Sequence, residues 1–208
     1  MVCEEIFKTR GACKTLRRYR RKGLDPIERG MVASIPGAEL GNARVLEIGG
    51  GIGAIQAKLL TAGASHGEII ELVPAYEPFA RQLARDEGIE SRSSFRIADV
   101  LDRPETVARA DIVVLNRVVC CSPDGVRLTA LGAHLARRAL LVSYPRDRLL
   151  VRLFMRMMNA VLRIMGKSFR VFLHPPASLY EAAQTEGLQI GETGRSFVWE
   201  FTAFRRSI

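Results

Sequence analysis

The residues best suited to chemistry are four glycines that follow a short apolar run carrying one carboxylate. The run covers residues 45–48 with the carboxylate at Glu47, and the glycines are Gly49, Gly50, Gly51 and Gly53. Glycine permits a tight turn with positive φ and leaves no Cβ between the backbone and a ligand. Apolar residues at helical spacing follow the turn. A strand, a glycine turn and a helix in this order predict a nucleotide-binding site.

Two kinds of nucleotide site fit these residues. Gly49-x-Gly51-x-x-Ala54 satisfies the dinucleotide fingerprint of NAD-dependent oxidoreductases. The stretch from Glu47 to Gly53 also reads E-x-G-x-G-x-G and resembles motif I of the class I methyltransferases that use S-adenosylmethionine (SAM). A carboxylate beside a pyrophosphate would be repelled, whereas SAM carries no phosphate, so Glu47 favours SAM. A purely structural glycine turn is the third interpretation.

The resemblance implies a place for each of these residues in a SAM site. It puts Glu47 near the amino and carboxyl end of SAM, and the backbone of the glycines beneath the ribose and methionine portion. Glu71 ends the next predicted strand, where an acid can accept hydrogen bonds from both ribose hydroxyls, and Leu72 follows it in the same expected site. Glu68 and Glu77 are nearby acids, but one begins the strand and the other lies within the following helix.

Three further residues complete the expected cofactor site: Asp99, Val100 and Asn116. Asp99 follows the third predicted strand, and the resemblance assigns its carboxylate to the adenine amino group and the backbone amide of Val100 to a ring nitrogen. A turn cap is the other interpretation of Asp99, since aspartate is common after strands. Asn116 and Arg117 break an apolar strand beside the place where the methyl group would lie. Strand ends also turn polar simply because they reach solvent.

The sequence offers three candidates for catalytic residues: His174, Arg117 and Tyr144. Methyl transfer from a sulfonium requires the protein mainly to position the acceptor and exclude water, and a base helps when the acceptor is a hydroxyl or carboxyl group. His174 precedes two prolines that could aim it at the pocket, although a packing or capping histidine explains the same residue. The three histidines have no metal-ligand spacing, so no metal site is predicted.

Strands and helices must alternate to position these residues. Strands are predicted over 44–48, 68–72, 94–98, 111–119 and 139–143, with helices over 75–87, 123–138 and 177–186. Two more strands over 188–192 and 197–204, joined by a turn at 193–196, close the chain as a hairpin. The pattern predicts an α/β fold, a Rossmann-like doubly wound sheet of seven strands with an antiparallel C-terminal strand and helices on both faces. The hairpin resembles the last strand pair of class I methyltransferases and leaves no room for the second domain of a dehydrogenase.

Residues 1–36 are expected to form a basic helical cap on a SAM-binding domain at 37–208. Helices are predicted over 6–22 and 26–35. The chain carries a net charge of +9, and residues 8–22 hold eight basic side chains and no acid. Such a segment suits RNA phosphates, anionic lipid or an acidic substrate, or is a solvated helix face.

Residues 146–166 are expected to form one amphipathic helix with an unusually wide apolar face. The polar residues at helical spacing are Arg152, Arg156, Asn159 and Arg163. An insert at this place resembles the substrate lid of small-molecule methyltransferases, and its methionines suit an adaptable apolar pocket. A homodimer face, a basic helix lying on a membrane, and a cover helix on the sheet are the other interpretations.

Length and composition set the general class of the protein. The 208 residues suit one globular domain, with 48% hydrophobic and 25% charged residues. No apolar run reaches the roughly 18 residues of a membrane span, and no secretory signal is seen. The cysteines show no C-x-x-C spacing, and Cys120 and Cys121 are expected to be small buried thiols. These features predict a cytoplasmic protein.

The function predicted from sequence is methyl transfer from SAM to a small, apolar or amphipathic acceptor. The stretches at 116–121 and 144–146 resemble small bacterial methyltransferases of the magnesium-protoporphyrin and quinone-biosynthesis groups. Val73 and Pro74 depart from the usual acid-x-Ser-x run, which removes one side-chain hydrogen bond to the ribose. RNA methylation through the basic N-terminus is an alternative, disfavoured because the chain has no N-P-P-[FY] tetrad and no aromatic-rich basic groove. A non-catalytic SAM-fold scaffold is a second alternative.

Overall fold

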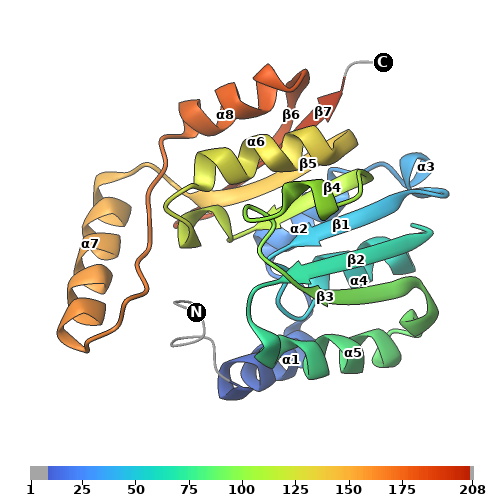
Figure 1. Ribbon diagram of the computed structural model, residues 1–208, viewed down its shortest axis with the longest axis horizontal. Helices are drawn as coiled ribbons and strands as arrows, with labels where there is room; N and C mark the ends of the chain where they lie inside the picture. Colours follow the sequence, from blue (N-terminus) through green and yellow to red (C-terminus); the bar gives the residue numbers. More distant parts are fainter. Residues whose placement is uncertain (1–8, 207–208) are drawn as a thin grey trace.

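The computed structural model describes residues 9–206, which fold into one mixed sheet with helices on both faces (Figure 1). The seven strands lie in the order β3-β2-β1-β4-β5-β7-β6. Their bounds are β1 Arg44–Ile48, β2 His66–Glu71, β3 Ser93–Ile97, β4 Ala110–Asn116, β5 Ala136–Pro145, β6 Leu188–Arg195 and β7 Trp199–Arg206. Strand β7 runs antiparallel to both neighbours, while the pairs from β3 to β5 are parallel. The predicted doubly wound α/β sheet with an antiparallel C-terminal strand is confirmed.

Helices connect the strands and lie over the two faces of the sheet. The α-helices are α1 Thr9–Lys22, α2 Pro26–Ala33, α3 Gly37–Leu40, α4 Ala54–Thr61, α5 Glu77–Asp86, α6 Gly125–Leu135, α7 Leu149–Ile164 and α8 Pro176–Thr185. Short 3-10 helices are η2 Pro74–Tyr76, η3 Glu90–Arg92, η4 Pro104–Thr106 and η5 Val119–Cys121. Within residues 9–206, none of the helices combines the length and the apolar character that crossing a bilayer requires.

The sheet is buried on both sides because successive side chains of a strand point to opposite faces. In β4, Ile112 and Val114 belong to a hydrophobic cluster that includes residues of α1, α2, α4 and α5. Val113 and Leu115 belong to a second cluster, which includes residues of α6 and α8. Such continuous apolar strands are typical of parallel sheets covered on both faces.

Helix α2 begins with a complete capping box, as the sequence Asp25-Pro26-Ile27-Glu28 predicts. Asp25 Oδ1 accepts hydrogen bonds from the amides of Ile27 and Glu28 at 3.0 and 3.1 Å. Glu28 Oε2 accepts one from the Asp25 amide at 2.8 Å. Helices α1 and α2 are the helices expected in the N-terminal cap, and the start predicted for the first, at residue 6, lies outside the described residues. The boundary at residue 36 stays a prediction.

The fourth predicted strand, 111–119, is too long at its carboxyl end. Strand β4 ends at Asn116, and Arg117 has a φ of 57°, a left-handed conformation that cannot continue a strand. The apolar residues that suggested more strand are buried for another reason. Val119 and Cys120 lie in the short helix η5 and are 0% and 3% exposed, whereas Cys121 is only half-buried.

Other predicted boundaries also differ from the structure, and two of these differences have a clear physical reason. The helix predicted to reach residue 138 ends at Leu135, because β5 already begins at Ala136, which pairs with Ala110 of β4. The closing hairpin turns later than the predicted 193–196. Strand β6 runs on to Arg195, and the Ser196 amide donates to the Trp199 carbonyl at 2.7 Å across the turn.

Candidate functional site

The glycine turn lies at the carboxyl end of β1 and leads directly into α4. Gly49, Gly51 and Gly53 have φ angles of 65°, 57° and 73°, which glycine adopts far more readily than other residues. The Gly49 amide donates to the Ile70 carbonyl at 2.8 Å, and the Gly53 amide donates to the Gly50 carbonyl at 2.8 Å. A tight strand-to-helix turn of glycines is the geometry expected of a nucleotide-binding loop.

Glu71 joins the end of β2 to this glycine turn. Its Oε2 accepts a hydrogen bond from the Gly51 amide at 2.9 Å, and its Oε1 accepts from the amides of Leu72 and Val73 at 2.8 and 3.1 Å. Burial raises the pKa of Glu71, although the three amide donors oppose this effect. Glu71, Leu72 and the glycines are therefore brought together, as the sequence predicts.

Glu47 lies beneath the turn and is only 2% exposed. Its Oε2 accepts a hydrogen bond from the Gln56 amide at 3.0 Å. Burial raises the pKa of Glu47 from 4.5 to about 8, and the negative charges of Glu28 and Glu71 act in the same direction. A buried carboxylate close to two other acids is well suited to a ligand that carries positive charge.

The burial of Glu47 predicts a pH-dependent stability of the ligand-free protein. Between its ordinary pKa of 4.5 and the folded value of about 8, the folded state keeps a proton that the unfolded state has lost. The free energy of unfolding should therefore decrease as pH rises through this window, by at most about 1.4 kcal/mol per pH unit. Glu47→Gln should lack this contribution. Urea unfolding of both proteins across the window tests this, and identical pH slopes would contradict it.

Asp99 and Val100 follow β3 next to the end of β2. Asp99 is exposed, and its Oδ1 accepts a hydrogen bond from the Leu101 amide at 2.9 Å, so the turn-cap interpretation describes this contact. Val100 is buried. The Ala98 amide donates to the Glu71 carbonyl at 3.2 Å, which places the start of this connection beside the Glu71 strand end. An exposed carboxylate that caps a turn remains accessible to a ligand.

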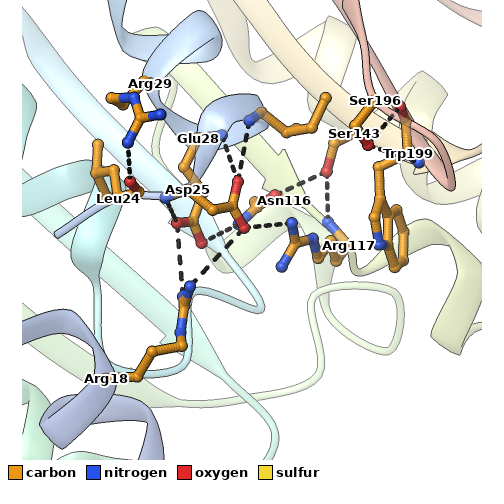
Figure 2. A network of polar contacts seen from close by, with 11 residues as sticks. Arg18, Leu24, Asp25, Glu28, Arg29, Asn116, Arg117, Ser143, Ser196 and Trp199 are labelled. Carbon is orange, nitrogen blue, oxygen red and sulfur yellow. Dashed lines mark hydrogen bonds and ion pairs between the residues drawn. The ribbon is translucent and has the colours of Figure 1, made fainter. Parts of the chain in front are cut away.

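Asn116 and Arg117, at the carboxyl end of β4, form part of a polar network with β5 and α2 (Figure 2). The Ser143 hydroxyl donates to Asn116 Oδ1 at 2.7 Å and accepts from the Arg117 amide at 2.9 Å. Asn116 Nδ2 lies 3.5 Å from Glu28 Oε1. These bonds hold the left-handed turn at Arg117, a conformation that costs energy in a residue other than glycine.

The Arg117 side chain folds back between α2 and β7 (Figure 2). Its guanidinium pairs with Asp25 Oδ2 and lies 4.9 Å from the centroid of the Trp199 ring. Burial alone would raise the pKa of Asp25, but the amide of Glu28 and the charge of Arg117 hold it below its ordinary value. The buried Nε of Arg117 has no hydrogen-bond partner among the described residues.

The sequence gives no sign of this contact between α2 and β4. Asp25 and Glu28 are fully explained as capping residues, and a side chain that caps a helix is not expected to serve a second element. Only the fold brings Asp25 to Arg117, across 92 positions of the chain. A polar pair at the end of an apolar strand is the single signal that could have suggested a partner.

Replacing Asp25 by asparagine should separate the ion pair from the helix cap, because asparagine is an equally good N-cap residue. We expect Asp25→Asn to lower the free energy of unfolding by about 1 kcal/mol, since the pair is partly exposed. The variant should also change the fluorescence of Trp199, the single tryptophan, as the guanidinium leaves its ring. Asp86→Asn, which breaks the exposed pair with Arg20, is the control. Unchanged fluorescence and stability in Asp25→Asn would contradict the contact.

His174 lies beside the connection that follows β4. The amide of Phe172 donates to the Cys120 carbonyl at 2.8 Å and anchors this loop to η5. His174 Nε2 lies 3.0 Å from the Ser122 carbonyl. A carbonyl can only accept, so Nε2 carries a proton in this contact, and in a neutral ring Nδ1 is then the basic nitrogen.

A cavity of about 330 Å³ lies beside His174, between the end of β5 and α7. Its lining residues are Pro145, Asp147, Arg152, Arg156, Leu173, His174 and Pro175. The volume is in the range of small-molecule sites. No group of three histidine, cysteine or acidic side chains within residues 9–206 could hold a metal ion.

Tyr144 occupies a different environment from the other candidate catalytic residues. Its side chain is 1% exposed, and its hydroxyl lies 2.7 Å from that of Tyr180 and 2.8 Å from that of Thr202. Burial raises the pKa of Tyr144, which disfavours a phenolate. The structure gives Tyr144 a place in the core between β5, β7 and α8, and does not bring it to the glycine turn.

No protein-family model and no curated protein matches this chain in sequence. Solved structures do match it in fold. Magnesium protoporphyrin IX methyltransferase (ChlM) from Synechocystis PCC 6803, solved with bound S-adenosylhomocysteine (SAH), superposes with a TM-score of 0.70 at 18% identity, over 93% of this chain and 86% of that one. The same enzyme was also solved with SAM.

Two longer proteins have a similar fold. An O-methyltransferase family protein from Burkholderia thailandensis gives a TM-score of 0.70 at 22% identity, over 96% of this chain and 60% of that one. An O-methyltransferase family 2 protein from Planctomyces limnophilus, in complex with apigenin, gives 0.70 at 15% identity, over 97% and 62%. This chain therefore spans less than two thirds of these two proteins. The topology and these likenesses show that the chain has the fold of the class I SAM-dependent methyltransferases.

Proposed function

We propose that this protein binds SAM along the carboxyl ends of β1 to β4 and transfers its methyl group to a small apolar or amphipathic molecule. The observation that carries the proposal is the contact between Glu71 and the Gly51 amide. This contact places a buried carboxylate, at the end of β2, against the glycine turn at the end of β1. In folds of this type the ribose of a nucleoside contacts both the acid and the turn.

The charges of the site and its buried donor without a hydrogen-bond partner fit SAM. When bound, SAM supplies a methyl group on a positively charged sulfur, already activated for displacement. Glu28 and Glu47 are buried carboxylates near the end of β1, and each gains stability from a cationic ligand. The buried Arg117 Nε, which lacks a partner within residues 9–206, offers a donor to a carboxylate.

Each residue of the proposed cofactor site has one task. Gly49, Gly50, Gly51 and Gly53 let the backbone approach the ligand, and Glu71 with Leu72 holds the ribose. Asp99 and the Val100 amide hold the adenine, while Glu47 and Asn116 hold the amino-acid end. An NAD site is disfavoured, because a pyrophosphate on the glycine turn would have to lie close to the carboxyl group of Glu71.

We assign the acceptor to the cavity beside His174. Pro145, Leu173 and Pro175 give part of its lining an apolar surface against which an acceptor can be positioned, and positioning is the main demand of this reaction. His174 Nδ1 would take the proton of an acceptor hydroxyl, since Nε2 is committed to the Ser122 carbonyl. The Arg117 side chain is engaged by Asp25 and Trp199 and does not line this cavity, so Arg117 has no role toward the acceptor in this proposal. Tyr144 has no role in this proposal.

The small-molecule proposal is supported by two proteins of similar fold, a magnesium protoporphyrin IX methyltransferase and an O-methyltransferase family 2 protein in complex with apigenin. The basic N-terminal segment offers less to RNA than its sequence suggested. Arg18 lies 3.6 Å from Glu28, and Arg20 lies 2.6 Å from Asp86, so two of its cations pair within the protein. RNA methylation would show a steep salt dependence.

An assay of SAH formation tests this proposal. We expect the protein to form SAH with a hydroxylated aromatic or porphyrin carboxylate acceptor, and His174→Gln to reduce kcat by about 100-fold or more while SAM affinity stays unchanged. His134→Gln, at an exposed histidine that contacts Glu186, is the matched control and should leave kcat unaltered. Equal loss of activity in both variants, or a weaker affinity for SAM in His174→Gln, would contradict the role of His174.

A further inference from the structure

Helix α7 leaves most of its large apolar side chains uncovered. Among residues 149–164, only Val151 and Met155 are buried. Leu150, Leu153, Met157 and Ile164 are 66%, 62%, 58% and 86% exposed. The helix stands apart from the sheet and its covering helices at one end of the molecule (Figure 1). An exposed apolar surface of this kind marks an interaction site.

The exposed residues share one face of the helix. Positions 150, 153, 157, 161 and 164 recur at intervals of three and four, so they lie along one side, while Val151 and Met155 point to the body of the protein. Arg152, Arg156 and Arg163 recur at intervals of four and seven and form a stripe beside the apolar face. All three arginines are exposed.

The segment of the chain that contains α7 is strongly basic. From residue 148 to residue 180 the chain contains no aspartate or glutamate, and its basic residues are Arg148, Arg152, Arg156, Arg163, Lys167 and Arg170. Asp147, at the start of this segment, pairs with Arg152. An apolar face bordered by arginines matches the boundary of an anionic membrane, where acyl chains lie next to phosphates.

We infer that α7 docks this protein on an anionic lipid surface, with its apolar face in the acyl boundary and its arginine stripe on the lipid phosphates. The helix would lie in the plane of the membrane, because its 16 residues are too few and too charged to span it. Long arginine side chains can rest their carbon stems on the apolar face while their guanidinium groups reach the headgroups.

A second copy of the chain fits this face less well. Two copies paired through α7 would bring together two segments that have cations and no acids between residues 148 and 180, so their arginine stripes would find no partner on the facing helix. A lipid phosphate supplies the missing negative charge. Docking would also place the cavity beside Arg152 and Arg156 at the membrane surface, within reach of an acceptor dissolved in lipid.

Sedimentation with vesicles tests the inference on the full-length protein. We expect binding to vesicles of equal parts phosphatidylcholine and phosphatidylglycerol, weaker binding at high salt, and little binding to phosphatidylcholine alone. Arg163→Gln should weaken binding to the mixed vesicles about fivefold, the equivalent of about 1 kcal/mol per basic residue. The double variant Leu153→Gln/Met157→Gln should weaken it about tenfold or more.

Matched controls lie on other surfaces. Arg103→Gln removes a cation whose side chain is 76% exposed, and Ile190→Gln removes an apolar residue that is 44% exposed. Both should bind vesicles like the wild type, and circular dichroism should show all variants folded.

Equal binding of the α7 variants and the wild type would overturn the inference. The inference would also be overturned if the wild type bound no vesicles and formed a dimer in light scattering that the double variant Leu153→Gln/Met157→Gln dissociated. SAM affinity measured on the same variants should be unchanged, which separates lipid docking from the proposed reaction.

Discussion

We expect Glu71→Ala to weaken SAM binding by at least about 100-fold. A carboxylate that accepts hydrogen bonds from two ribose hydroxyls contributes about 1.5–3 kcal/mol for each charged bond, so losing both has a large effect on affinity. The same substitution removes the acceptor of the Gly51, Leu72 and Val73 amides, which loosens the turn that must receive the ligand. Isothermal titration calorimetry with SAM measures the change.

Two other acids near β2 provide the controls. Glu68 lies in the same strand and pairs with Arg96 at 2.9 Å, while Glu77 begins α5 and pairs with Arg81 at 2.7 Å. Glu68→Gln and Glu77→Gln should keep the affinity of the wild type for SAM. If Glu71→Ala bound SAM as tightly as these controls, or if Glu68→Gln lost binding instead, Glu71 would not be the ribose acid. Thermal unfolding of each variant distinguishes lost affinity from lost structure.

Gly49→Ala should lower the free energy of unfolding by about 2–4 kcal/mol and abolish detectable SAM binding. Gly49 has a φ of 65°, which strains any residue with a side chain, and a Cβ there would lie only 2.5 Å from Val118 Cγ2. Valine is stiff at χ1, so Val118 cannot easily turn aside. Chemical unfolding measures the loss of stability, and calorimetry measures binding.

The chain offers controls that separate strain from overlap. Gly88 has a φ of 67° but no atom within 4 Å of an added Cβ, so Gly88→Ala should cost only about 1 kcal/mol, the effect of the backbone conformation. Val118→Ala should remove the shortest contact, the one to Cγ2, while the contact to Cβ at 2.9 Å remains, and so restore part of the stability of Gly49→Ala. Two results would show that Val118 does not approach the turn closely. One is an equal loss of stability in Gly49→Ala and Gly88→Ala, and the other is no gain of stability in the double variant Gly49→Ala/Val118→Ala over Gly49→Ala.

The periodic features of the sequence predicted the sheet well because they depend on local spacing. Strand β1 has the predicted bounds, Arg44–Ile48, since an apolar run that ends at a glycine turn is ambiguous neither in type nor in length. The strand predicted over 111–119 is too long because the buried residues of η5 produce the same apolar run as a strand. An apolar run indicates that its residues are buried, but it does not show where the strand ends. The strand ends where the backbone of Arg117 takes a left-handed conformation.

The candidate site was predictable where neighbouring strand ends meet, and not beyond. The carboxyl ends of β1 and β2 are adjacent in any sheet of this topology, so the contact of Glu71 with the glycine turn follows from the pattern. The ion pair of Asp25 with Arg117 depends on how α2 crosses the sheet edge, which no local spacing records. Tyr144 shows the opposite case. Its position near the end of a strand was predicted, but its hydroxyl contacts those of Tyr180 and Thr202 in the core, and no local spacing predicts these partners.

Ligand binding by the purified protein tests the central claim most directly. Glu47, Glu71 and the glycine turn are proposed to form a site for SAM, so calorimetry against SAM, SAH and NAD separates a SAM site from a dinucleotide site. We predict that SAM and SAH bind at one site, that Glu71→Ala weakens the binding of both by at least about 100-fold, and that NAD gives no heat of binding. Tight binding of NAD with no response to SAM or SAH would contradict the account.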